Sequence, residues 1–304
     1  MYWNSLNEKL RQEYGGKVYK LALTSGCTCP NRDGTLGSRG CIFCDGAGAF
    51  AESGPIPVQL QAARKRVAAK AGKDAKYIAY FQAFTNTYAP VKTLRELYTA
   101  AMEPEDVVVL SVATRPDCIS DEVLELLAEL NQRKPVWVEL GLQTIHPESA
   151  AYIRRGYDLP VFEDAVRRLR ETGMEVIAHQ ILGLPGETSD MMAETAQYIG
   201  QIGASGVKFH LLHVLEHTDL AEEWRAGHVP IMELDTYVAV LENCVRHIPE
   251  DMVIHRLTGD GAKRDLLAPL WSGDKKRVLN TIHRAFAEHD VVQGSALKQK
   301  KTVG

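Results

Sequence analysis

The sequence lacks a long apolar run. None of its segments approaches the roughly 18 to 20 consecutive apolar residues that a membrane span needs, and Met1-Tyr2-Trp3-Asn4 does not open a signal peptide with a basic start and an apolar stretch. Internal repeats, low-complexity tracts and long linkers are also missing. We therefore expect a globular cytoplasmic protein that does not associate with a membrane.

An excess of basic charge is missing as well. The 304 residues include 35 Lys and Arg against 39 Asp and Glu, for a net charge of -4. This balance is not typical of a dedicated nucleic-acid-binding protein, although an acidic protein can still carry a locally basic face. Basic runs occur at Arg64-Lys65-Arg66 and near the C-terminus, and an RNA substrate would be expected to place phosphates on them. Composition leaves the substrate open.

Short β-branched or aromatic segments alternate with longer helical ones, as in βα units around a parallel sheet. We predict strands at 17–23, 77–81, 107–113, 136–142, 175–181 and 207–212, with a further one at 252–257. We predict helices at 58–70, 91–102, 121–132, 161–171, 190–202, 232–247 and 275–288. Six βα units in one register predict one α/β domain, a partial (β/α)6 barrel whose reactive face lies at the carboxyl ends of its strands. The core would span about 17–215, a C-terminal helical extension about 216–294 and a frayed tail 295–304.

Four of the six cysteines lie between positions 27 and 44. In a cytoplasmic protein such a cluster more often binds metal or acts in catalysis than forms disulfides. Cys41 and Cys44 can direct two thiolates at one centre, and Cys29 can return as a third because the glycines between them let the backbone curl. Three thiolates on a four-iron cluster would leave one iron open to another ligand. A structural zinc site that adds Cys27 fits the same loop, and the loop alone does not decide between the two.

Motifs along nearly the whole chain favour iron and sulfur. They are Cys29-Pro-Asn-Arg-Asp-Gly34, Gly40-Cys-Ile-Phe-Cys44, Tyr80-Phe-Gln-Ala-Phe-Thr-Asn-Thr87, Thr114-Arg-Pro-Asp-Cys118, Glu139-Leu-Gly-Leu-Gln-Thr144, Gly183-Leu-Pro-Gly-Glu187 and Leu267-Ala-Pro-Leu-Trp271. With them the sequence resembles the YhcC/YtqA-type radical S-adenosylmethionine (radical SAM) proteins. These are similar in turn to the radical SAM domain of the Elongator catalytic subunit and to oxygen-independent coproporphyrinogen oxidase. The resemblance implies a radical SAM barrel that binds a [4Fe-4S] cluster and S-adenosylmethionine (SAM).

The resemblance also implies roles for individual residues. Cys29, Cys41 and Cys44 match the cluster ligands, Gln143 would touch the SAM ribose, and Arg155 would grip its carboxylate with a planar guanidinium. The implied cofactor-binding set is Phe43, Gln82, Thr114, Glu139, Gln143, Arg155, His179, Ile181 and Gly183. Elongator-like relatives often carry a glutamate before Thr-Arg-Pro-Asp that can receive the SAM amino group. Ala113 stands there in this sequence, so that contact comes from elsewhere or is absent.

Lys208, His210 and Cys118 are candidates for substrate binding or proton transfer. Lys208 and His210 share one face of a predicted strand, and Cys118 follows Arg-Pro-Asp at the predicted reactive rim. The more common fates of such residues are structural: a strand histidine is usually packed and satisfied, and a lone cysteine is usually a small buried side chain.

The resemblance implies that the reduced cluster cleaves SAM to methionine and a 5′-deoxyadenosyl radical, which removes hydrogen from an unactivated C–H bond. Such chemistry needs a reductant such as flavodoxin or ferredoxin. Relatives point to tRNA with a wobble uridine of the 5-carboxymethylaminomethyl type as the substrate. Radical oxidation of a small metabolite, or a non-catalytic RNA-binding scaffold held by zinc, stays open as an alternative.

Overall fold

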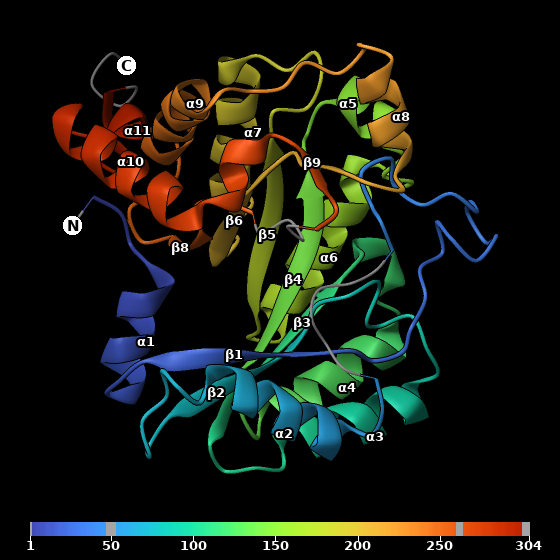
Figure 1. The fold of residues 1–304 in the computed structure, drawn as a ribbon. Helices are drawn as coiled ribbons and strands as arrows, with labels where there is room; N and C mark the ends of the chain where they lie inside the picture. The colour runs from blue at the N-terminus through green and yellow to red at the C-terminus, as the bar shows by residue number, and fades with distance from the viewer. Residues whose placement is uncertain (1, 47–52, 260–263, 300–304) are drawn as a thin grey trace.

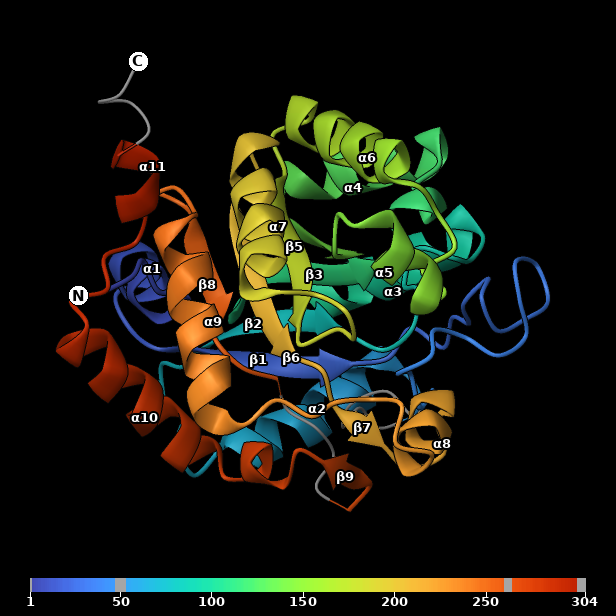
Figure 2. The same cartoon turned by 90° about the horizontal axis from the view of Figure 1, so that it is seen from above.

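The computed structural model describes residues 2–46, 53–259 and 264–299. A seven-stranded parallel sheet forms its centre, with the strands in the order β1-β2-β3-β4-β5-β6-β8. Their bounds are β1 Val18–Leu23, β2 Lys76–Phe81, β3 Val107–Thr114, β4 Val136–Gln143, β5 Glu175–Leu182, β6 Gly206–Leu211 and β8 Val253–Arg256. The predicted α/β partial barrel is confirmed, and the seventh strand comes from the predicted C-terminal extension. The sheet curls (Figures 1 and 2), with β1 and β8 as its two edges.

Helices pack against the outer face of the curled sheet. The predicted ones are present, α3 and α10 with the predicted bounds and the others with ends shifted by one to three residues: α2 Ile56–Val67, α3 Val91–Met102, α4 Asp121–Asn131, α6 Leu159–Glu171, α7 Ser189–Gln201, α9 Leu234–Arg246 and α10 Lys275–Glu288. A side chain caps the start of three of them, α4, α7 and α10; in α4, Ser120 accepts a hydrogen bond from the Val123 backbone amide. Each buries one apolar stripe; Val123, Leu126, Leu127 and Leu130 of α4 are an example.

The sequence did not predict several short elements. They are α1 Leu6–Tyr14, α5 Pro147–Tyr152, α8 Asp219–Arg225, the two-stranded antiparallel pair β7 Val214–Leu215 and β9 Leu266–Ala268, and the 3-10 turns Pro116–Cys118 and Leu270–Gly273. The frayed tail is also corrected in part, because Ser295–Gln299 forms helix α11. The Gly294 amide donates to the Val245 carbonyl at 3.2 Å and Arg246 reaches Ser295 Oγ, which ties the segment to α9. Residues 300–304 lie outside the described part.

Side chains that point into the barrel form layers. The layer at the amino ends of the strands is apolar and includes Val18, Ile78, Val109, Trp137, Ile177 and Val253. Helix α1 closes this end with Leu6 and Leu10, each buried leucine contributing about 1.5 to 3 kcal/mol. A polar layer and then a cavity lie beyond it, toward the carboxyl ends of the strands. The barrel interior is therefore apolar at the amino ends of the strands and polar toward their carboxyl ends.

The longest helix in the described residues is α10, with 14 residues. No helix among them combines the length and the apolar character of a membrane span.

Candidate active site

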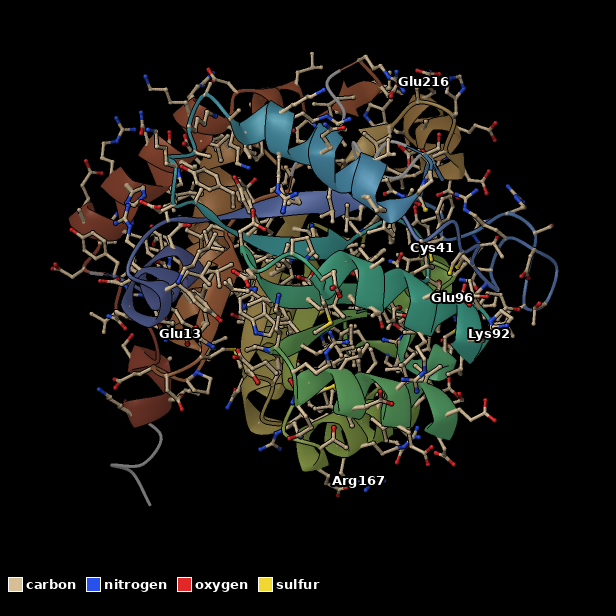
Figure 3. All side chains as sticks on the ribbon, turned by 90° about the horizontal axis from the view of Figure 1, so that it is seen from below. Glu13, Cys41, Lys92, Glu96, Arg167 and Glu216 are labelled. Atoms are coloured by element: carbon tan, nitrogen blue, oxygen red, sulfur yellow. The ribbon has the colours of Figure 1, made fainter. Side chains whose placement is uncertain are left out.

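The cysteine loop leaves β1 and wraps over the carboxyl ends of the strands. Figure 3 labels Cys41 there, at the opposite side of the molecule from Glu13 on α1. The loop is held by its own backbone: the Arg32 amide donates to the Cys29 carbonyl at 2.8 Å and the Gly40 amide to the Asn31 carbonyl at 2.7 Å. Gly40 has φ +75, and a Cβ there would lie 2.8 Å from Arg32 Nε. The positive φ favours glycine at position 40, and a larger residue there would also displace the end of the Arg32 side chain.

Asn31 fastens this loop to the segment after α5. Its side-chain amide donates to the Arg154 carbonyl at 2.9 Å and lies 3.5 Å from Cys41 Sγ. Gly156 makes room for it, because a Cβ at Gly156 would lie 2.7 Å from Asn31 Oδ1. The position of Cys41 therefore depends on a glycine more than a hundred residues away.

Gly156→Ala is expected to destabilise the protein by about 3 kcal/mol, because alanine would carry the strain of a φ of +81 and would also displace Asn31. Gly173→Ala is the matched control. Gly173 has φ +76 but open space around its would-be Cβ, so only the strain of about 1 to 2 kcal/mol is expected. Urea unfolding measures both, and equal losses would show that the Asn31 contact does not matter.

A cavity of about 280 Å³ opens beside the loop at the carboxyl ends of the strands. Most of the residues singled out in the sequence line it: Cys29, Cys41, Phe43, Cys44, Gln82, Thr114, Glu139, Gln143, Arg155, His179 and His210. Ile181, Gly183, Lys208 and Cys118 are not among its lining residues. Ile181 packs in an apolar cluster, and Gly183 has φ +90 with its amide 3.2 Å from Met192 Sδ. The loop thiols and the predicted cofactor-binding side chains thus face one shared space.

Two buried arginines form part of the cavity wall. Arg155 Nη1 donates to the carbonyls of Leu142 and Thr144 at 3.1 and 2.7 Å, and its Nε donates to the Tyr157 carbonyl at 3.0 Å. Arg115 grips Asp117 in two places, and both guanidinium groups lie against the Tyr157 ring, 5.0 and 4.8 Å from its centroid. Burial disfavours the Arg115 charge, but Asp117 outweighs this and raises its pKa. Both cations are therefore fixed in orientation.

Among the described residues that line this cavity, Glu139 is the only acidic one, and it is fully buried. Tyr80 Oη and Ser111 Oγ donate to its two oxygens at 2.9 and 2.8 Å. Lys208 Nζ forms a buried ion pair with it and also donates to Tyr80 Oη at 3.0 Å. His179 Nε2 lies 2.9 Å from the same carboxylate, and Lys20 Nζ lies 3.8 Å away. We call Lys20, Tyr80, Ser111, Glu139, His179 and Lys208 the interior network.

The interior network sets protonation states. Burial alone would raise the pKa of Glu139, but the ammonium groups of Lys208 and Lys20 hold it well below its usual range. Burial also lowers the pKa of Lys208 well below its ordinary value, against the opposing pull of Glu139. One carboxylate is thus shared by two lysines, with Arg256 adding positive potential. The centre of the barrel favours negative charge from any further ligand.

His210 lines the cavity next to His179, with the two ring centroids 4.9 Å apart. Burial holds the pKa of His210 well below its usual range, so its imidazole is neutral at pH 7. Its Nε2 is buried and has no hydrogen-bond partner among the described residues. A buried polar atom in that state favours a ligand group that can pair with it.

The two cysteines outside the predicted triad lie elsewhere. Cys27 packs against the outer hydrophobic core, its Sγ is 4.0 Å from the Asn86 carbonyl, and it does not line the cavity. Burial and Asp117 raise the pKa of Cys118 to about 12, so it is a protonated thiol at neutral pH. Among the described residues, no three His, Cys, Asp or Glu side chains are gathered closely enough for a single metal ion. The position of Cys27 against the outer core separates it from the cavity that Cys29, Cys41 and Cys44 line.

Residues 31–199 match the family model of the radical SAM superfamily. The chain belongs to this superfamily. Residues 204–288 match the model of the radical SAM C-terminal domain. The chain is 43% identical over 296 residues to YtqA of Bacillus subtilis, covering 96% of this chain and 92% of YtqA, which confirms the YhcC/YtqA-type family.

Two more distant relatives are a tRNA uridine(34) acetyltransferase and an archaeal Elp3. A tRNA uridine(34) acetyltransferase from Methanocaldococcus jannaschii is 29% identical over 123 residues, 40% of this chain and 22% of that protein. Elp3 from Methanocaldococcus infernus, solved without its first 46 residues, has a TM-score of 0.70 at 17% identity. That match covers 91% of this chain and 64% of the Elp3 chain, and it shows a shared fold.

A [4Fe-4S] cluster and SAM are the cofactors of this radical SAM protein. The donor set fits them, since three thiols line one cavity, two fixed arginines form part of its wall, and His210, which also lines it, has a buried Nε2 without a hydrogen-bond partner among the described residues. The cofactors of this family therefore rule out the hypothesis that the cysteine loop holds a structural zinc ion in a non-catalytic scaffold. Burial raises the pKa of Cys41 to about 11, so a metal must displace its proton to bind.

The sequence did not single out Lys20, Tyr80, Ser111, Arg115 and Tyr157 as site residues. The sequence did contain a signal for Lys20. Like Glu139 and Lys208, it is a charged residue at an interior position of an otherwise apolar strand, and buried charges need partners. Arg115 has a local partner in Asp117, but its contact with the Tyr157 ring joins two separate segments, so no local pattern marks that contact.

Proposed function

We propose that this protein is a radical SAM enzyme in which Cys29, Cys41 and Cys44 hold the [4Fe-4S] cluster and the adjoining cavity holds SAM. The observation that carries the proposal is that these three thiols share one cavity with Gln143, Arg155 and His210, while Cys27 lies apart. When bound, the two cofactors supply a 5′-deoxyadenosyl radical that removes hydrogen from the substrate. A protein reductant such as flavodoxin or ferredoxin would supply the electron.

In this proposal the residues of the protein bind and orient the cofactors and the substrate. Two nitrogens of Arg155 donate to backbone carbonyls, so its guanidinium plane is held before a ligand arrives, and a SAM carboxylate would meet a preorganised charge. Gln143 has φ +67 and its side chain lies against Gly141, where a Cβ would come within 2.8 Å of Nε2. This brings an amide to the rim, within reach of the ribose. Phe43, Gln82 and Thr114 complete the proposed SAM contacts, with Ile181 and Gly183 as backing for the adenine.

Ala113 leaves the SAM amino group without the carboxylate found in Elongator-like relatives. Glu139 stands beside it in strand register, yet both Glu139 oxygens already accept hydrogen bonds from the interior network. We therefore propose that backbone carbonyls or Gln82 receive the amino group, and that Glu139 acts by fixing Lys208, Tyr80 and His179 around the substrate. His210 Nε2 and Lys208 are the proposed proton-transfer groups, whereas the raised pKa and location of Cys118 leave it a supporting role at most.

The proposed substrate is tRNA with a wobble uridine of the 5-carboxymethylaminomethyl type. Its support is the similarity to a tRNA uridine(34) acetyltransferase over 40% of this chain and the Elp3-like fold. Cells lacking the gene should accumulate an unprocessed wobble uridine, and nucleoside mass spectrometry of their tRNA should detect it. Complementation with the wild-type gene should restore the profile, and complementation with a Cys41→Ala gene should not.

An unchanged nucleoside profile would contradict the tRNA substrate. If the purified protein nevertheless released 5′-deoxyadenosine from SAM under reducing conditions, the radical SAM assignment would stand and a small metabolite would become the substrate. The cationic interior network would then favour an anionic metabolite.

A further inference from the structure

The sheet leaves a seam between its two edge strands, β1 and β8. In the described residues β8 pairs only with β6 and β1 only with β2, and an isolated bridge joins Ile254 of β8 to Ser5, the residue before α1. A cavity of about 420 Å³ lies along this seam, and its lysine, arginine and histidine lining residues are Lys20, His255, Arg256, Lys275 and His283. Among the described residues that line it, none is acidic. Lys20 is 3.8 Å from Glu139, so the seam cavity ends at the interior network on whose other side the active-site cavity lies.

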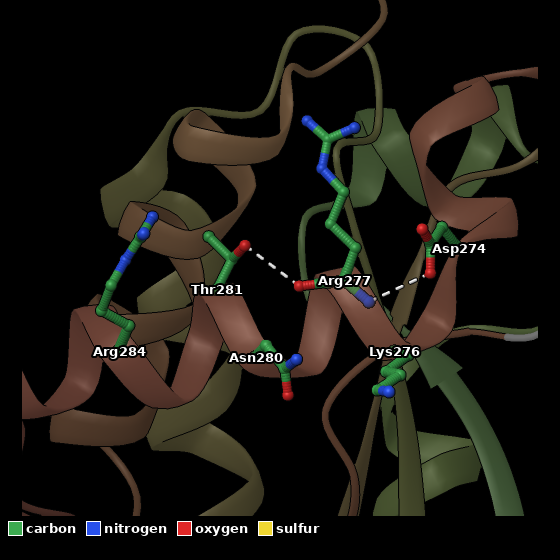
Figure 4. Close-up of a pocket in the computed structure, with 6 residues that line it drawn as sticks. All are labelled: Asp274, Lys276, Arg277, Asn280, Thr281 and Arg284. Atoms are coloured by element: carbon green, nitrogen blue, oxygen red, sulfur yellow. Dashed lines mark hydrogen bonds between the residues drawn. The ribbon is translucent and has the colours of Figure 1, made fainter.

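Helix α10 borders this seam and presents three faces. Val278, Ile282 and Phe286 are buried in the core. Lys275, Leu279 and His283, spaced four apart, line the seam cavity. The third face lines a separate hollow of about 450 Å³ and consists of Lys276, Arg277, Asn280, Thr281 and Arg284, with Asp274 at its end. In the close-up of Figure 4, Arg277, Thr281 and Arg284 extend from the same side of the helix.

The charges on this third face are not explained by the stability of the helix. The first turn of α10 is Lys275-Lys276-Arg277 and contains no acidic residue. Cations at that position oppose the helix dipole, which favours negative charge at the amino end. Asp274 caps the helix by accepting from the Arg277 amide at 3.1 Å, and Arg284 Nε lies 3.9 Å from the Glu288 carboxylate. A chain with net charge -4 therefore keeps four cations on one helix against a single acid.

We propose that this outward face of α10 binds the phosphate backbone of the RNA substrate next to the seam cavity. Three long cations with two hydrogen-bonding side chains on one helical face match a run of phosphates, which accept from Lys, Arg, Asn and Thr alike. The adjoining cationic cavity would receive the remaining anionic edge of the docked strand. The inference rests on the proposed function, because it takes tRNA as the substrate.

The test compares two charge-reversed variants of the cofactor-loaded protein. Lys276→Glu/Arg277→Glu changes the proposed face, and Lys92→Glu/Arg133→Glu makes the same change in net charge on α3 and after α4. Lys92 lies at the other side of the molecule from α10 (Figure 3). Binding of bulk tRNA is measured by fluorescence anisotropy between 50 and 200 mM salt. The α10 variant is expected to bind at least about tenfold more weakly at low salt and to lose about two units of salt slope.

The control variant should stay within about twofold of the wild type. The thermal midpoint of the α10 variant should not fall, because glutamates suit the first turn of a helix, and its SAM cleavage without substrate should be unchanged. Equal weakening in both variants, or undiminished binding by the α10 variant, would overturn the docking face while leaving tRNA as the substrate. Failure of the wild type to bind tRNA at 50 mM salt would overturn both. Loss of reduction by an acidic redox protein with unchanged tRNA binding would assign the face to the reductant instead.

Discussion

Replacing Cys41 with alanine is expected to remove the iron–sulfur cluster and to reduce SAM cleavage to background. Cys41 lines the active-site cavity with Cys29 and Cys44, and three thiolates are the full set of protein ligands that the proposed cluster has. With one of them gone, iron content after anaerobic reconstitution should fall from about four per chain to well below that value. Iron analysis, the brown charge-transfer absorbance and release of 5′-deoxyadenosine measure the loss.

Cys27→Ala is the matched control, in the same loop and with the same atoms removed. Cys27 packs against the outer core and does not line the cavity, so this variant should keep its iron and its SAM cleavage within about twofold of the wild type. If it lost iron as completely as Cys41→Ala, the loop would use four cysteine ligands. No open iron would then remain for SAM, and the radical mechanism would fail.

Glu139→Gln is expected to cost about 3 to 5 kcal/mol of unfolding free energy, the usual penalty for removing one partner of a buried ion pair. The substitution preserves shape but leaves Lys208, with 2% of its side chain exposed, and Lys20 without their shared counter-charge. Urea unfolding measures the loss. Ser111→Ala, which removes one neutral donor to the same carboxylate, is the milder comparison at about 1 to 2 kcal/mol.

A double variant tests whether charge causes this loss. Glu139→Gln/Lys208→Met removes both members of the pair, so it should be less destabilised than the sum of the single variants by about 2 to 3 kcal/mol. Strict additivity of the two single losses would mean that the carboxylate and the ammonium do not interact.

The pH dependence gives an independent check on Glu139. Because Lys208 and Lys20 hold the pKa of this carboxyl well below its usual range, its stabilising contribution is fully present above the unfolded-state value of about 4.3. It is lost as the pH falls through the lower folded-state pKa. The stability difference between the wild type and Glu139→Gln should therefore be constant near neutral pH and shrink under acid conditions. A stability difference that grew as the pH fell would contradict the lowered pKa of Glu139.

The sequence alone predicted the architecture because the architecture depends on local periodicity. The alternation of strands and helices can be recognised within segments of five to fifteen residues. Helices α3 and α10, for example, begin and end where the spacing of their apolar residues predicted. The short elements α1, α5 and α8 were missed because packing, not a long apolar stripe, stabilises them.

The candidate site was likewise predicted only in part. The sequence by itself singled out the three loop cysteines and most of the side chains that line the cavity, because strands, and the loops that follow their carboxyl ends, converge on one face of a parallel sheet. Only the tertiary structure decided that Cys27 lies apart, that backbone carbonyls hold Arg155, and that Glu139 joins lysines from β1 and β6. The physical reason is distance along the chain: closing the barrel brings together side chains separated by up to about two hundred residues, and no local pattern records which of them will meet.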